Sequence, residues 1–174
     1  IIQAFENFIR DEAYPCVAAR AALMRLQIPC LVAEHMACPH DDSRILEFIY
    51  KFVNDYRGAR QSMHSAAVIF RQPEHLTEEA FDALLWNRLQ SLSQLDSQRF
   101  AYDPRVSSDP SAPDFSFSLG EEAFFVIALH PASKRTSRKF KYPAMVFNPH
   151  AQFEQMRIDN RYEKMKQIVR KRDI

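Results

Sequence analysis

Glycine is nearly absent from this chain, because Gly58 and Gly120 are the only two among 174 residues. A loop that cradles phosphates through its backbone needs several glycines close together, so nucleotide-binding loops of that kind are excluded. Long apolar runs are absent too, and none approaches the roughly 20 residues that a transmembrane helix needs. The first residues show no basic segment followed by an apolar stretch, so no secretory signal is predicted.

Cysteine is scarce, and its three occurrences at Cys16, Cys30 and Cys38 are an odd number. A chain in which 47% of the residues are hydrophobic can build a core without cross-links. These features argue against a disulfide framework and indicate a reducing compartment. We therefore predict a cytoplasmic protein with no membrane partner.

The net charge is only +1, but the cations gather toward the end of the chain. Residues 134–172 hold twelve lysines and arginines, against Glu154, Asp159 and Glu163. Such a local basic surface on a nearly neutral protein favours an anionic ligand or cofactor over general nucleic-acid affinity.

The pattern of apolar residues predicts an α+β fold in a single domain spanning residues 1–174, with a small mixed or antiparallel sheet packed against several helices. Trp86 is predicted to lie in the core. Asp42 or Ser43 is expected to cap a helix, and Asn160 to open the last one through a capping box. Helices are predicted to begin near residues 2, 15, 43, 78, 149 and 161. Strands are predicted over 66–70, 115–119, 123–129 and 143–147, and residues 29–42 and 103–114 are predicted to be irregular.

The segment from residue 130 to 138 carries the first candidate site. His130 ends a buried apolar strand, where its side chain is placed to project into a neighbouring cavity. Ser133, Arg135 and Arg138 follow, and such side chains hold carboxylates or phosphates by charge-assisted hydrogen bonds. Taken alone, the segment is also typical of a solvated basic loop.

A second candidate lies in the next motif, where His150 falls in the first turn of a predicted helix. Glu154 comes one turn later on the same face. A histidine with a neighbouring carboxylate is suited to binding a metal or haem, or to acting as a base. Cys16 is the third candidate, because the N-terminus of a helix favours a thiolate that can bind iron. Both His150 and Cys16 are also compatible with purely structural roles.

Five stretches, taken in this order, resemble the YqcI/YcgG family. They are a Pro-Cys followed by an alanine-rich helix (15–22), a Trp-x-x-Leu-Gln-x-Leu helix ending in Asp (86–96), an Asp-Pro loop leading to Phe-x-Phe (109–117), His-Pro-x-Ser-x-Arg (130–135) and Phe-Asn-x-His-x-Gln-Phe-Glu (147–154). The resemblance covers almost the whole chain. Each motif alone is unspecific, and the ordered set carries the resemblance.

The resemblance implies a haem-dependent N-oxygenase, since family members with an assigned role look like enzymes that hydroxylate a guanidine nitrogen of arginine or a related amino acid. The implied cofactor is haem b, whose two propionates need cations. Arg135 and Arg138 are the expected partners of the propionates, with Ser133 and His130 as further cofactor-binding residues.

The resemblance also implies an axial ligand to the haem iron, for which the candidates are His150, His130 and Cys16. Of these, His150 is favoured, because a carboxylate beside a helix-borne imidazole fixes its orientation. Glu154 and Asn148 are the candidate catalytic residues, and Glu154 would orient His150 or bind a guanidinium substrate.

The implied partners are a small guanidino or amino substrate, O2 and an electron donor, and a homodimer is compatible with the sequence. Two alternatives stay open. One is a haem-binding sensor or carrier without turnover, and the other is a basic module that binds anions or nucleic acid.

Overall fold

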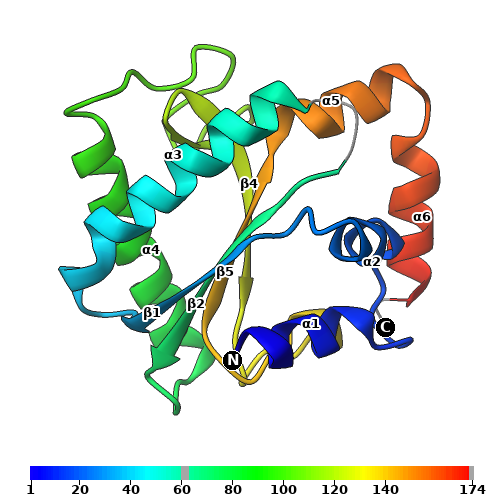
Figure 1. Ribbon diagram of the computed structural model, residues 1–174, viewed down its shortest axis with the longest axis horizontal. Coiled ribbons are helices and arrows are strands. Elements are labelled where there is room, and N and C mark those ends of the chain that lie inside the picture. The colour runs from blue at the N-terminus through cyan, green and yellow to red at the C-terminus, as the bar shows by residue number, and fades with distance from the viewer. Residues whose placement is uncertain (60–62, 173–174) are drawn as a thin grey trace.

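A five-stranded mixed sheet forms the centre of the computed structural model, which describes residues 1–59 and 63–172. The strand order is β1-β2-β5-β4-β3 (Figure 1). β1 pairs with β2 in parallel, and all other neighbours are antiparallel. The predicted α+β class is thereby confirmed. The strands are β1 (Cys30–His35), β2 (Ala66–Gln72), β3 (Phe117–Leu119), β4 (Glu122–Leu129) and β5 (Ala144–Pro149).

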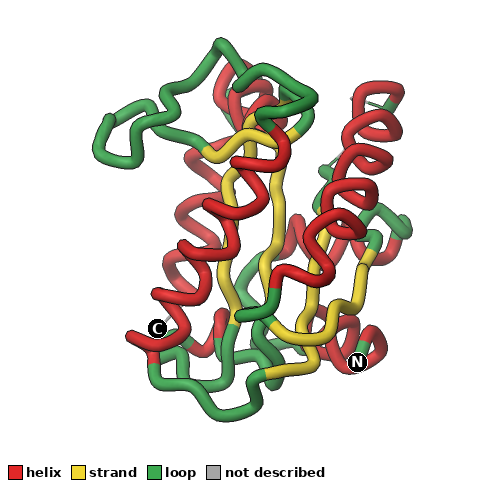
Figure 2. Tube along the Cα trace, turned by 90° about the vertical axis from the view of Figure 1, so that its left-hand side faces the viewer, coloured by secondary structure: helices red, strands yellow, loops and turns green. Residues whose placement is uncertain are grey.

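Helices cover both faces of this sheet (Figures 1 and 2). On one face lie α3 (Asp42–Gly58) and α4 (Glu78–Asp96), and on the other lie α1 (Ile2–Arg10) and α2 (Val17–Met24). The chain then ends with α5 (His150–Ile158), directly after β5, and α6 (Tyr162–Arg172). In Figure 1, α6 lies beside α2 at one side of the molecule.

Successive residues of β2 point to opposite faces, as the pleat of a strand requires. Val68 and Phe70 belong to the core beneath α3 and α4, while Ala67 and Ile69 belong to the core beneath α1 and α2. Because both faces are covered, β2 reads as a continuous apolar run instead of an alternating one.

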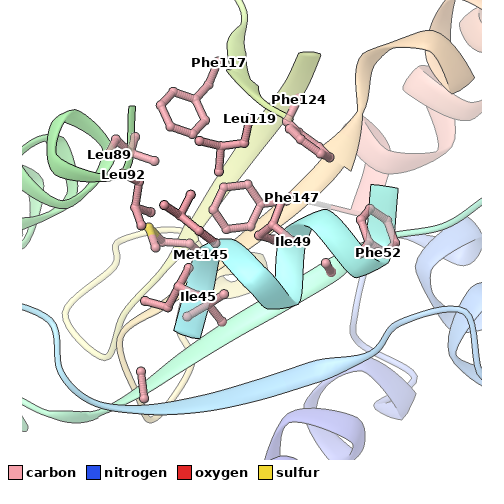
Figure 3. Packing of buried hydrophobic residues seen from close by; sticks show 14 of the residues in the cluster. Ile45, Ile49, Phe52, Leu89, Leu92, Phe117, Leu119, Phe124, Met145 and Phe147 are labelled. Carbon is pink, nitrogen blue, oxygen red and sulfur yellow. The ribbon is translucent and has the colours of Figure 1, made fainter. Parts of the chain in front are cut away.

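The larger core lies between α3, α4 and the sheet, and its aromatic and branched side chains interdigitate (Figure 3). Tight packing of this kind makes the sheet a rigid support for the loops and helices at its ends. The residues labelled in Figure 3 are Ile45, Ile49, Phe52, Leu89, Leu92, Phe117, Leu119, Phe124, Met145 and Phe147.

The predicted connector over residues 29–42 is wrong in its first half, where β1 forms. This strand lies at the sheet edge, pairs with a single neighbour, and is largely half-exposed or exposed. Its sequence therefore lacks both the buried run and the strict alternation that identify strands. Pairing with the strongly predicted β2 stabilises it, and that pairing is not visible in a local pattern.

Three local predictions are also wrong. Asp42 does not cap α3, because its carboxylate accepts hydrogen bonds from Arg88 and Ser91, 2.8 and 2.5 Å away. Trp86 is 45% exposed, since the buried stripe of α4 runs along a different face. Asn160 ends α5 in the left-handed conformation, with φ of 55°, and α6 begins two residues later.

Asp96 joins three elements at the end of α4. Its Oδ1 accepts hydrogen bonds from the Tyr50 hydroxyl of α3, at 2.8 Å, and from the amide of Gly120, at 2.9 Å. Gly120 has φ of 60° in the β3–β4 turn, and an added Cβ would lie 3.1 Å from the Tyr50 ring. The carboxylate thus anchors the turn to two helices.

We expect Asp96→Ala to lower the free energy of unfolding by about 3 kcal/mol, because it leaves two buried donors without a partner at roughly 1–3 kcal/mol each. Tyr50→Phe, which keeps the Gly120 bond, should cost less than half as much. Urea denaturation of both variants measures this, and equal losses would contradict the assignment.

Candidate functional site

The β4–β5 hairpin carries the segment singled out from the sequence. After β4 the chain forms a loop over residues 131–138, called the cationic loop below, and returns into β5. The amide of His130 donates to the carbonyl of Arg138 at 3.0 Å, which closes the loop. The strand-end position predicted for His130 is confirmed.

An apolar cavity of about 240 Å³ lies on the sheet face covered by α1 and α2. Its floor is formed by side chains of β4 and β5 that point to this face, including Ile127, Leu129 and Val146. Its walls come from α1, α2 and α6. Small side chains of α2 leave the space open, since Ala18, Ala19 and Ala22 line it.

A cationic cleft of about 630 Å³ adjoins the apolar cavity. Both hollows are lined by Arg138, Phe153, Met165 and Val169, so they lie on either side of the same four side chains. The cleft adds Arg135 of the cationic loop, together with Lys166 and Arg170 of α6. Within the described residues, no carboxylate forms a salt bridge with Arg135 or Arg138. An apolar cavity therefore lies beside two arginines that form no salt bridge with any carboxylate of the described residues.

Cys16 lies at the wall of the apolar cavity. It is the N-cap of α2, and its Sγ accepts a hydrogen bond from the amide of Ala19 at 3.4 Å. The predicted position at a helix N-terminus is thereby confirmed. None of the three cysteines forms a disulfide. Burial raises the pKa of Cys30 to about 11, with Glu6 adding to the shift, so Cys30 stays a neutral thiol at pH 7.

A buried polar pair interrupts the apolar wall of this cavity. The Ser65 hydroxyl donates to Oδ1 of Asn148 at 2.7 Å, and the Asn148 amide nitrogen donates to the carbonyls of Phe125 and Val146. Both residues line the cavity. The carbonyl oxygen of Asn148 keeps a second lone pair, which makes it an acceptor at the cavity surface.

His150 and Glu154 do not line the apolar cavity. They border a separate edge cleft of about 620 Å³, with Arg105 and Arg157. His150 stacks on Phe125 with ring centroids 4.6 Å apart, and its Nε2 lies 3.2 Å from Oε1 of Glu154. The predicted one-turn spacing brings these two side chains together, but Glu154 also pairs with Arg157.

His130 lies on the other face of the sheet from Cys16. Its ring stacks on Phe81 of α4, with centroids 4.2 Å apart, and it is 5% exposed. It lines neither the apolar cavity nor the cationic cleft. Ser133 is likewise buried, and its hydroxyl accepts from the amide of Arg135 at 3.3 Å, so it shapes the cationic loop.

The sequence prediction missed the contribution of α6 and of Phe153 to the walls. Met165 and Val169 lie one helical turn apart, which is the signal that predicts one shared helix face. That spacing does not say what the face covers. Only the fold places it opposite α2, more than 130 residues earlier in the chain.

In the part of the chain that the structure describes, metal-holding clusters and membrane-spanning helices are both absent. No group of three or more His, Cys, Asp or Glu side chains is arranged to hold a metal ion. A haem iron needs only an axial side chain from the protein, so its binding does not depend on such a group. No helix within the same residues has both the length and the apolar character to cross a bilayer.

The YqcI/YcgG family model matches residues 5–174 of the chain. The chain is 26% identical to the uncharacterized protein YqcI of Bacillus subtilis (strain 168) over 169 residues, and 24% identical to the uncharacterized protein YcgG of the same strain over 170 residues. These alignments cover 94% and 92% of this chain but 65% of each relative, so the chain spans less than two thirds of their length. No solved structure matches it. The family match, over nearly the whole chain, shows that this protein belongs to the YqcI/YcgG family.

Proposed function

We propose that the chain binds haem b and N-hydroxylates a guanidino or amino nitrogen of a small molecule such as arginine. The observation that carries this proposal is an apolar cavity beside a cleft whose arginines, Arg135 and Arg138, form no salt bridge within the described residues. The N-hydroxylation part of the proposal is supported by the resemblance of the sequence motifs to the family. The haem part is supported by the residues of the site.

The residues of the two hollows fit the parts of haem b. A flat apolar ring system gains free energy from leaving water for walls of leucine, isoleucine, valine and phenylalanine. Its two propionates need cations at the mouth, and Arg135 and Arg138 would hold them by charge-assisted hydrogen bonds. Without an anion, the side chain of Arg138 stays half-buried beside apolar walls, and no carboxylate of the described residues neutralises it.

Cys16 is our proposed axial ligand, in preference to His150 and His130. It is the one of these three candidates that lines the apolar cavity. His150 borders the edge cleft beyond Phe125, and His130 stacks on Phe81 across the sheet. A thiolate ligand also suits an oxygenase, because it donates electron density to the iron.

Haem iron would supply the oxygen chemistry of the reaction. The protein would exclude bulk water through the walls that α1, α2 and α6 provide. Asn148 would orient the substrate, because its amide oxygen accepts a hydrogen bond from a guanidinium or amino N–H at the cavity surface. Glu154 borders the edge cleft and not the apolar cavity, so we assign it no direct contact with the substrate.

The test is turnover of the haem-loaded protein with arginine and related guanidines, supplied with O2 and a chemical reductant. Mass spectrometry should detect a product that has gained one oxygen on nitrogen. Haem binding without any such product would support the carrier or sensor alternative, and would remove the hydroxylase part of the proposal.

A further inference from the structure

His130 is a buried histidine that the proposed function leaves unused. It is 5% exposed, and its Nδ1 is buried without a hydrogen-bond partner among the described residues. One face of its ring is stacked on Phe81, with the two planes 19° apart. An unpaired ring nitrogen is tolerable as a bare acceptor, but not as an N–H that carries positive charge.

The backbone of His130 holds both ends of the cationic loop. Its amide donates to the Arg138 carbonyl at 3.0 Å, and its carbonyl accepts from the Ser133 amide at 3.3 Å. Ser133 in turn accepts the Arg135 amide on its hydroxyl. The positions of Arg135 and Arg138 therefore depend on His130 staying in its place against Phe81.

Two charged groups, one on α4 and one on the cationic loop, bear on His130. The negative charge of Glu78, in the first turn of α4, favours the protonated form of His130. Lys134 of the cationic loop forms a salt bridge with Glu78 at 3.3 Å. Burial lowers the pKa of His130 below its ordinary 6.5, and Glu78 offsets only part of that effect.

We propose that His130 is the positioning residue of the cationic loop, and that protonation of its ring releases this loop from α4 and displaces Arg135 and Arg138 from the cleft. The inference deepens the proposed function, since the anion released on acidification would be the haem propionates. The loop movement itself does not depend on which anion binds there.

The direction of the pH effect follows from the lowered pKa. With the loop closed His130 resists the proton, and with the loop open it titrates at its ordinary value. Proton binding thus favours the open loop. The closed loop is fully stable above pH 6.5 and loses stability as the pH falls below that value. Because opening is linked to the binding of one proton, the equilibrium constant for opening rises by at most about tenfold per pH unit.

Amide hydrogen exchange measured from pH 7.5 to 5 tests this on the wild-type chain without added haem. After correction for intrinsic exchange, protection of the His130, Ser133 and Arg138 amides should fall by up to about tenfold per unit below pH 6.5. Amides in the core of β5, such as that of Phe147, should keep their protection. Unchanged protection of the loop amides across this range would overturn the proposal.

His130→Phe provides the matched variant, since a phenyl ring can stack on Phe81 and cannot be protonated. Its loop amides should be as protected at pH 5.5 as at pH 7.5. His75→Gln is the control, because His75 is exposed in the turn before α4, and this variant should keep the wild-type response. A wild-type response that persists in His130→Phe would also overturn the proposal.

The haem readout separates this inference from the proposed function. If haem binds, its dissociation should accelerate more steeply below pH 6.5 in the wild type than in His130→Phe. If the loop amides respond as expected but haem never binds, the positioning role of His130 stands and the proposed function fails. If haem binds and the loop is insensitive to pH, the haem-binding part of the proposed function stands and the positioning role of His130 fails.

Discussion

Replacing Cys16 by alanine is expected to weaken haem binding more than about a hundredfold and to remove the Soret band of the thiolate-ligated protein. Changes in residues that merely orient a ligand cost ten- to a hundredfold in affinity, and loss of the ligand itself costs more. The reason for choosing Cys16 is its position at the wall of the apolar cavity, in contact with Ala19 of α2. Spectrophotometric titration with haemin measures both effects.

Two matched variants make this experiment specific. Cys30→Ser removes a cysteine of the same sheet face that does not line the cavity, and it should leave the band unchanged. His150→Gln should retain haem within about threefold, because His150 borders the edge cleft. A Soret band that survives in Cys16→Ala and disappears in His150→Gln would show that the histidine favoured from the sequence is the ligand.

Removing the arginines of the cationic cleft is expected to produce the second-largest change. Arg138→Gln should weaken haem binding by about tenfold or more, because the half-buried guanidinium would hold a propionate by a charge-assisted bond of roughly 1.5–3 kcal/mol. Arg135→Gln should cost less, about threefold, because this side chain is exposed and solvent screens its charge. Dissociation constants from haemin titration distinguish the two.

Lys139→Gln serves as the control, since Lys139 follows the cationic loop but lines neither hollow. It should change the affinity less than twofold. The effect of Arg135→Gln should also shrink at high salt, where exposed charges are screened. Equal losses in Lys139→Gln and Arg138→Gln would mean that only overall charge matters, and that the cleft does not hold the propionates.

The sequence alone predicts the local part of this site well. Glu154 lies against His150 because four residues make one helical turn, and Cys16 caps α2 because a proline precedes an alanine-rich helix. Both follow from rules that act over a few residues. The α+β class follows in the same way from the periods of the apolar patterns.

The global part of the site is not accessible to such rules. His130 and Cys16 are both plausible ligands by residue type, yet they lie on opposite faces of the sheet. The side chain of His130, at the end of β4, points toward α4, whereas Cys16 lies at the start of α2 on the other face. Met165 of α6 and Ala19 of α2 come to line one cavity only through the fold. Residue type selects the candidates. Which of them share a cavity is decided by the face of the sheet to which each side chain points, and successive side chains along a strand point to opposite faces.

Titration of the purified chain with haemin, followed by its Soret absorption, tests the central claim most directly. The account predicts saturation at one haem per chain, with a shifted Soret band that is lost in Cys16→Ala and preserved in Cys30→Ser. A chain that shows no saturable Soret change, or one that binds haemin equally well in all three forms, would contradict the assignment of the apolar cavity as a haem site.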